Sequence, residues 1–136
     1  RAEEVDKEKL ASFAGDLMYN SKISINLQAT SSHFTFNGDS GTNELAQTAI
    51  GQGKTLITPL QNAMVMCAIA NDGVMMQPYL VDQVKNIDGG VIKESEPEEM
   101  ASPLKKSECD VLKKMLRKVV SSGTGTKSYS SEYTVY

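Results

Sequence analysis

Two short patterns bring together residue types that could perform nucleophilic catalysis. Ser102-Pro103-Leu104-Lys105 places a serine three residues before a lysine, and Ser24-Ile25-Asn26 places a serine two residues before an asparagine. A serine becomes a nucleophile when a base within hydrogen-bond reach takes its proton and nearby donors stabilise the developing oxyanion. Both patterns are therefore candidates for an acyl-transfer site.

The surroundings of these patterns do not suit that chemistry. The stretch from Ser95 to Pro103 is acidic and interrupted by prolines, which predicts an exposed connection around Ser102. Patterns this short also arise by chance in a chain rich in Ser and Lys. We interpret both as coincidental, so the sequence predicts no catalytic residue.

Metal and cofactor sites are not indicated either. His33, the only histidine, has no second ligand nearby and is interpreted as a surface or loop residue. Cys67 and Cys109 match neither a zinc pair nor a redox C-x-x-C. Each lies on the apolar side of an expected helix, so both are expected to be buried free thiols. The glycines of Gly51-Gln52-Gly53-Lys54 lack the full phosphate-loop pattern, and no nucleotide site is predicted.

Size and charge exclude several classes of protein. The chain has 136 residues, 40% of them hydrophobic, enough for one small domain with a modest core. Its net charge of −3 and its pI near 5.2 give no reason to expect a nucleic-acid partner. No apolar run approaches the ~18 residues of a membrane span, so the chain is expected to be soluble. It opens without Met and ends on Tyr133–Tyr136, so both ends are interpreted as cut.

The strongest helix signals lie between Ile50 and Val81. Thr58 suits the N-cap, Pro59 suits the first helical position, and Gln61 is placed to complete a capping box. Asn71-Asp72-Gly73 then predicts the end of the helix. The expected core stripe of this helix comprises Leu60, Met64, Cys67 and Ala68, widened by Ala63 and Val65, and the methionines expected to fill the core are Met64, Met66, Met75 and Met76.

The remaining segments are expected to form short elements around this helix. Apolar spacing at Leu10, Phe13, Ala14, Leu17 and Met18 predicts a helix over 5–19, and alternation predicts a strand over 23–27, with a turn-rich irregular segment as the alternative. A loop over 30–42 and a brief helix over 44–49 are then expected before the central helix. After that helix we expect a strand over 79–86, a turn at Asp88-Gly89, a strand over 91–94 and a solvated connection over 95–103.

A second long helix is expected near the end of the chain. Ser107 would cap it with Asp110 at the third position, and Gly123 would end it. Beyond it, residues 124–136 are expected to be a mobile tail that leads into a strand at Tyr133–Tyr136. The core face of this helix is expected to comprise Val111, Leu112, Met115, Leu116, Val119 and Val120.

The central stretch resembles a known family. Its signature segments are Gly51-Gln52-Gly53, Thr58-Pro59-Leu60-Gln61, Ala70-Asn71-Asp72-Gly73 and Pro78-Tyr79-Leu80-Val81, followed later by Gly123-Thr124. In this order and spacing they resemble the middle of the transpeptidase domain of penicillin-binding proteins, and the similarity extends from about Asp6 onward. The resemblance implies an α+β fold of the penicillin-binding protein and β-lactamase type, with helices packed against a small antiparallel sheet.

The resemblance also implies a reaction. These transpeptidases are serine acyl-transferases that act on the D-alanyl-D-alanine end of cell-wall stem peptides and are acylated by β-lactams. Their catalytic groups come from S-x-x-K, then S-x-N, then K-T-G on a strand. Here Ser24-Ile25-Asn26 precedes Ser102-Pro103-Leu104-Lys105, the reverse of the family order, and no K-T-G is present. Gly51, Gln52, Gly53 and Thr58 match the family pattern and are interpreted as backbone turns and a helix cap.

The chain is therefore interpreted as one partial transpeptidase domain, residues 1–136, from between the second and third motifs of a longer enzyme. It would have a structural role and no activity alone, while the parent would work on the extracytoplasmic face of the bacterial membrane and bind stem peptides and β-lactams. The alternative is a freestanding, non-catalytic transpeptidase-like module. Such a module would bind a partner, or a second copy, through an open strand edge at Tyr133–Tyr136.

Overall fold

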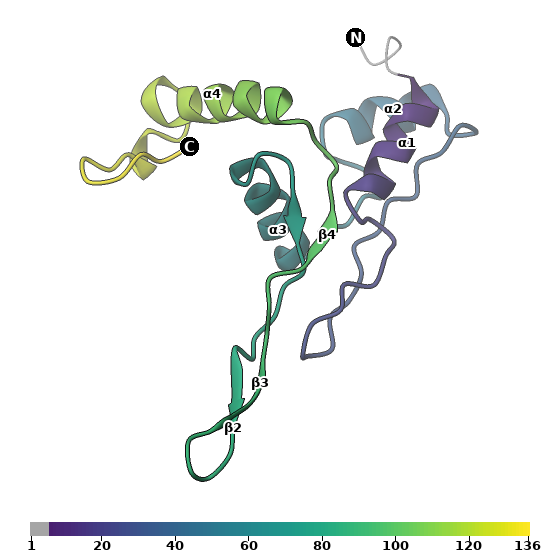
Figure 1. Cartoon of the computed structure of the whole chain (residues 1–136). Coiled ribbons are helices and arrows are strands. Elements are labelled where there is room, and N and C mark those ends of the chain that lie inside the picture. Colours follow the sequence, from purple (N-terminus) through teal and green to yellow (C-terminus); the bar gives the residue numbers. More distant parts are fainter. Residues whose placement is uncertain (1–5) are drawn as a thin grey trace.

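The computed structural model describes residues 6–136; Val5, the expected start of the first helix, lies outside this range. Within it the chain forms an α+β arrangement, as the sequence predicts. The helices are α1 (Lys7–Asp16), α2 (Thr42–Ala49), α3 (Pro59–Ala70) and α4 (Lys106–Ser122), the strands are β1 (Met75–Met76), β2 (Gln83–Lys85), β3 (Val91–Glu94) and β4 (Glu99–Ala101), and a 3₁₀ turn follows at Thr126–Ser128 (Figure 1).

Helix α3 has the bounds that its capping residues predict. The Thr58 hydroxyl accepts a hydrogen bond from the N–H of Gln61 at 3.2 Å, and Pro59 occupies the first turn. The side chain of Gln61 does not complete a capping box, because its Nε2 donates instead to the carbonyl oxygen of Leu17. Helix α3 contacts both β1 and α4, so it connects the two halves of the described chain.

The core lies on one face of α3. The buried face consists of Gln61, Met64, Ala68 and Ile69. The expected stripe was therefore partly wrong, since Ala63 and Cys67 are exposed. Because α3 is apolar on nearly every side, helical periodicity alone does not select its inner face. The central cluster comprises Ile23, Met64, Ala68 and Met75, packed against Leu17, Met18, Leu60, Val65, Met100 and Ala101.

The methionines divide between the core and the surface. Met64 and Met75 are buried, as expected, whereas Met66 and Met76 are exposed. Met75 begins β1, which pairs antiparallel with β4 in the register Met75↔Ala101. The sequence predicted neither strand and placed β4 in a solvated connection. That prediction was wrong because strands of two and three residues carry almost no periodic signal.

The predicted hairpin is present but shorter than expected. Strand β3 has the predicted bounds, β2 pairs with it in the register Gln83↔Glu94, and Gly89 takes a positive φ of 85° in the turn. The expected strand over 79–86 starts only at Gln83. The N–H groups of Leu80 and Val81 point to the side-chain oxygen of Asn26 instead of a neighbouring strand. Figure 1 shows the hairpin reaching away from the helices.

The segment after α1 also departs from expectation. The helix ends at Asp16, three residues before the predicted Tyr19, because Met18 takes a left-handed φ of 66°. The predicted strand at 23–27 is absent from the described structure, and the irregular alternative holds there. Ile23 is nevertheless buried. Its apolar side chain packs in the core and does not mark a strand.

Helix α4 begins earlier than predicted and buries less of its surface. Its N-cap is Lys105 and not Ser107; the Lys105 N–H donates to Glu108 Oε2 at 2.8 Å. Only Cys109 and Val120 are buried. The expected core face was wrong for Val111, Met115 and Val119, whose exposed fractions are 49%, 60% and 45%. These residues form an apolar stripe on the outside of α4.

The chain after α4 ends in a segment that forms no strand in the described structure. Gly123 follows the helix as its C-cap, as predicted. Residues 133–136 pair with no other strand of the described chain, so the strand expected at Tyr133–Tyr136 stays a prediction. Among residues 6–136, every helix is too short or too polar to cross a bilayer.

Candidate functional site

The serine–lysine pattern lies in an exposed connection. Ser102 and Lys105 are both exposed and lie between the end of β4 and the start of α4. The backbone of Lys105 serves as the cap of α4, so this segment is a connection and not the start of a buried helix. The structure thus offers Ser102 no buried base or oxyanion donor within its own pattern.

The serine–asparagine pattern has a structural use. Asn26 Oδ1 accepts the N–H of Leu80 at 2.9 Å and the N–H of Val81 at 3.4 Å. The carbonyl oxygen of Ser24 accepts a hydrogen bond from Gln77 Nε2. These contacts attach the irregular segment after α1 to the base of the β2–β3 hairpin. Sequence reasoning identified Asn26 but did not predict this role.

The glycine pair forms the turn that ends α2. Gly51 and Gly53 have φ values of 73° and 86°, in the left-handed region that glycine favours. The N–H of Gly51 donates to the carbonyl oxygen of Thr48 at 3.0 Å. Lys54, which follows the pair, lies 3.5 Å from Glu44 of α2. The loop is therefore a backbone turn with its lysine already in an ion pair.

His33 and the acidic residues form no metal centre in the described part of the chain. The backbone of His33 pairs with Leu56, with N···O distances of 2.8 and 2.9 Å, and its side chain is exposed. No group of three His, Cys, Asp or Glu side chains within residues 6–136 could hold a metal ion. Cys109 is a buried free thiol, as expected, but Cys67 is exposed, which corrects the prediction for that residue.

A buried polar cluster fixes the start of α3. Ser32 Oγ accepts the N–H of Thr58 at 2.9 Å, and the Ser32 side chain is almost fully buried. The side chain of Gln61 is equally buried and reaches the backbone of Leu17 through its Nε2. Its Oε1 has no hydrogen-bond partner among residues 6–136. This cluster joins α3 to the segments around Leu17 and Ser32, and the sequence indicated only the Thr58 cap.

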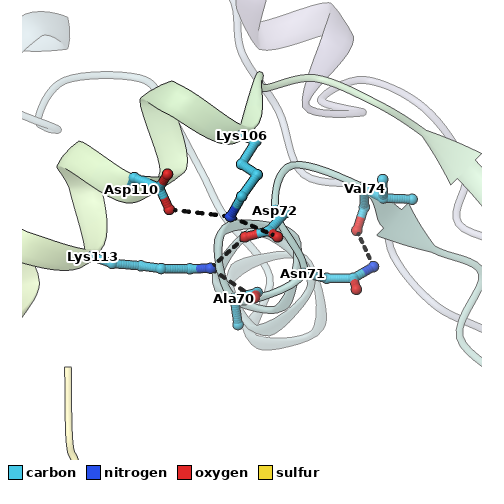
Figure 2. Close-up of polar contacts among 7 residues, drawn as sticks. All are labelled: Ala70, Asn71, Asp72, Val74, Lys106, Asp110 and Lys113. Carbon is cyan, nitrogen blue, oxygen red and sulfur yellow. Dashed lines mark hydrogen bonds and ion pairs between the residues drawn. The ribbon is translucent and has the colours of Figure 1, made fainter.

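A charged junction joins the end of α3 to α4 (Figure 2). Asp72, just after α3, has a left-handed φ of 54° and lies 2.8 Å from Lys113 Nζ and 2.9 Å from Lys106 Nζ. Lys113 also donates to the carbonyl oxygen of Ala70 at 3.0 Å. Lys106 lies 3.4 Å from Asp110 as well. We call Ala70, Asp72, Lys106 and Lys113 the α3–α4 junction.

The junction changes the acidity of its own groups. The hydrogen bond from Lys113, followed by that from Lys106, lowers the pKa of Asp72 below its ordinary value. The hydrogen bond to Asp72 raises the pKa of Lys106. Both shifts favour the charged forms, so the junction is ionised near neutral pH. Because the side chains are solvent-accessible, these shifts indicate positioning and not the poised acid and base of a catalytic site.

The two helices also enclose an apolar hollow beside the junction. It measures about 250 Å³. Its walls are mainly hydrophobic, with Lys113 at one side. Arg117 Nη1 donates to the carbonyl oxygen of Val135 at 2.9 Å, which holds the end of the chain against α4. The residues that line the hollow are Met66, Ile69, Ala70, Lys113, Leu116 and Tyr136.

The contacts described above connect elements that lie far apart in the sequence. None of the sequence patterns places a serine beside a buried base, while buried contacts connect α1, α3 and the segment around Ser32, and charged contacts connect α3 to α4.

Comparison with known families gives a match over the full sequence. The family described as "Penicillin binding protein transpeptidase domain" matches residues 1–136. Among curated relatives, Stage V sporulation protein D of Bacillus subtilis is 27% identical over 135 residues, which are 98% of this chain and 21% of that protein. Peptidoglycan D,D-transpeptidase PbpA of Mycolicibacterium smegmatis is 47% identical over 55 residues, 40% of this chain and 11% of that protein.

Solved structures match the fold. The D,D-transpeptidase domain of a peptidoglycan glycosyltransferase from Eggerthella lenta superposes with a TM-score of 0.82 at 31% identity, covering 93% of this chain and 34% of that chain. The penicillin G acyl-enzyme complex of penicillin-binding protein A from M. tuberculosis has a TM-score of 0.74 at 28% identity, covering 79% and 25%. This chain therefore spans about a third or less of each of these four relatives.

Proposed function

The chain belongs to the transpeptidase-domain family of penicillin-binding proteins, and on that premise we propose that it is a structural segment of a longer D,D-transpeptidase. The family predicted from the central sequence motifs is thus confirmed. The whole enzyme would cross-link peptidoglycan stem peptides. Its active serine, outside these 136 residues, would form an ester with the penultimate D-alanine carbonyl and release the terminal D-alanine. An amine of a second stem peptide would then displace the serine and form the cross-link.

One observation carries this proposal. The family match spans residues 1–136, yet this sequence has no K-T-G, and its serine–lysine pattern lies in an exposed connection. We infer that this segment supports the fold of the whole enzyme, whose catalytic groups would come from other segments. The β-lactam complexes known for the M. tuberculosis relative support the further proposal that the whole enzyme is acylated by β-lactams.

The proposed site of action follows from the substrate. The PbpA relative carries the name of a peptidoglycan D,D-transpeptidase, and peptidoglycan is assembled outside the cytoplasmic membrane. We place the whole enzyme on that face of the membrane. Its partners there would be stem peptides and, as inhibitors, β-lactams.

The proposal is tested by reading the source gene on both sides of these codons. We expect K-T-G within a few codons after Tyr136, and S-x-x-K followed by S-x-N before Arg1. A stop codon directly after Tyr136, together with an upstream sequence that lacks both motifs, would contradict the proposal. That outcome would favour a freestanding, non-catalytic module.

A further inference from the structure

We propose that Asp72 and Lys113 are positioning residues for acylation of the whole enzyme, because they fix α4 at the angle at which its outer apolar stripe meets the rest of the domain. The proposal rests on the proposed function above. It assigns a role to two residues outside the serine, lysine and asparagine patterns.

The contacts at the junction restrain α4 in more than one direction. Lys113 lies in the second turn of α4 and donates both to Asp72 Oδ1 at 2.8 Å and to the carbonyl oxygen of Ala70 at 3.0 Å. Lys106, in the first turn of α4, reaches the other carboxylate oxygen of Asp72 at 2.9 Å. Two successive turns of α4 therefore bind one carboxylate, and this limits rotation of α4 about its own axis (Figure 2).

The backbone beside Asp72 reinforces this restraint. Gly73 has a φ of 104° and lies so close to Leu104 that a Cβ atom at this position would collide with the Leu104 carbonyl oxygen. Leu104 immediately precedes the N-cap of α4. The end of α3 and the start of α4 thus touch through backbone atoms at Gly73 and through charges at Asp72.

The outer stripe of α4 explains why its angle would matter. Val111, Met115 and Val119 recur every four residues on one face of the helix, and all three are exposed. The chain covers 34% of the solved domain from Eggerthella lenta, so most of a comparable domain lies outside it. We assign the remainder of the transpeptidase domain as the occupant of this stripe. A change in the angle of α4 would then shift that remainder, which carries the reacting groups.

The test compares variants of the full-length enzyme that carries this segment. Lys113→Met removes both hydrogen bonds of the lysine, and Asp72→Asn removes the charge but keeps a residue that tolerates a left-handed φ. Lys113→Arg keeps the charge, and Lys114→Met changes a neighbouring exposed lysine as a matched control. Fluorescent penicillin measures two quantities for each protein: the fraction that becomes labelled and the acylation rate constant of that fraction. Thermal unfolding is followed in parallel.

A positioning role and a merely structural role give different results. We expect Lys113→Met and Asp72→Asn each to lower the acylation rate constant about tenfold, the order expected for a small misplacement of reacting groups, with the labelled fraction unchanged. The loss of rate in the double variant should be smaller than the two single losses combined, because both single variants remove the Lys113–Asp72 contact. Lys113→Arg should restore most of the rate, and Lys114→Met should match the wild type.

Two outcomes would overturn the inference while leaving the proposed function intact. One is a wild-type rate constant in both junction variants, with at most a smaller labelled fraction or a lower Tm. The other is an equal loss of rate in Lys114→Met. Failure of the wild-type enzyme to be labelled at all would contradict the proposed function itself.

Discussion

Lys113, a residue of α4, donates a hydrogen bond to the carbonyl oxygen of Ala70 at 3.0 Å and so caps the last turn of α3 from outside. The last turn of α3 contains no basic residue of its own. A cation at this end of a helix is favourable, because the free carbonyl groups carry partial negative charge. One lysine therefore satisfies a helix end and fixes the neighbouring helix.

Glycine is required at position 73. We expect Gly73→Ala to lower the free energy of unfolding by about 3 kcal/mol or more, because it combines left-handed strain with a collision against Leu104. Gly89→Ala is the matched control. Its φ is 85°, but the space around it is open, so its cost should be about 1 to 2 kcal/mol. Urea unfolding measures the loss of stability in both variants. Equal losses would show that Leu104 moves aside for the added methyl group at little cost.

The junction should make stability depend on pH in a defined direction. The pKa of Asp72 is lowered from 3.8, so its contribution is fully present above pH 3.8 and is lost as the pH falls through the lower folded value. The pKa of Lys106 is raised from 10.5, so its contribution is present below that pH and is lost as the pH rises through the folded value.

This dependence is checked by measuring Tm across pH for the wild type and Asp72→Asn. The difference in Tm between them should be constant near neutral pH and should shrink below about pH 3.8. It should also shrink in high salt, since the ion pairs are exposed to solvent. A difference that persists unchanged at acidic pH would show that the ion pairs do not stabilise the fold.

Removing the hydroxyl of Ser32 should lower the free energy of unfolding, although Ser32 lies in a loop. Ser32→Ala would leave the N–H of Thr58 without its acceptor at 2.9 Å in a largely buried site, at a cost of about 1 to 3 kcal/mol. Ser31→Ala is the control, since that hydroxyl has no hydrogen bond within residues 6–136, and its effect should stay within about 0.5 kcal/mol. Chemical unfolding compares them. Equal effects would contradict the assigned role.

The two cysteines should differ in reactivity. In the folded 136-residue chain, Cys67 is exposed and should react with an aromatic disulfide reagent within minutes, while buried Cys109 should react only after unfolding. Absorbance of the released thiolate counts the reacting groups. Cys67→Ser should abolish the fast phase and leave the slow one. A fast phase that survives this substitution would place Cys109 at the surface.

Local chemistry explains what the sequence could predict. The N-cap Thr58, the first-turn Pro59 and the terminating Asn71-Asp72-Gly73 act within a few residues, so the bounds of α3 follow from them. The turn at Gly89 and the bounds of β3 were predictable for the same reason. Family membership was equally accessible, because it rests on short segments and their order along the chain.

Long-range contacts explain what the sequence could not predict. Met75 pairs with Ala101, 26 positions later in the chain, and neither strand is long enough to show alternation. The inner face of α3 depends on what packs against it, which is why Cys67 was misplaced. The capping of α3 by Lys113 joins residues 43 positions apart. None of these contacts produces a periodic pattern of residues in the sequence.

The central claim is that this chain is a non-catalytic part of a penicillin-reactive enzyme. Intact mass spectrometry of the 136-residue chain after incubation with penicillin G tests it most directly. We expect the mass of the unmodified chain alone, because Ser102 and Lys105 lie in an exposed connection and the sequence contains no K-T-G. A stoichiometric penicilloyl adduct that disappears in Ser102→Ala would contradict the claim and would make Ser102 a nucleophile.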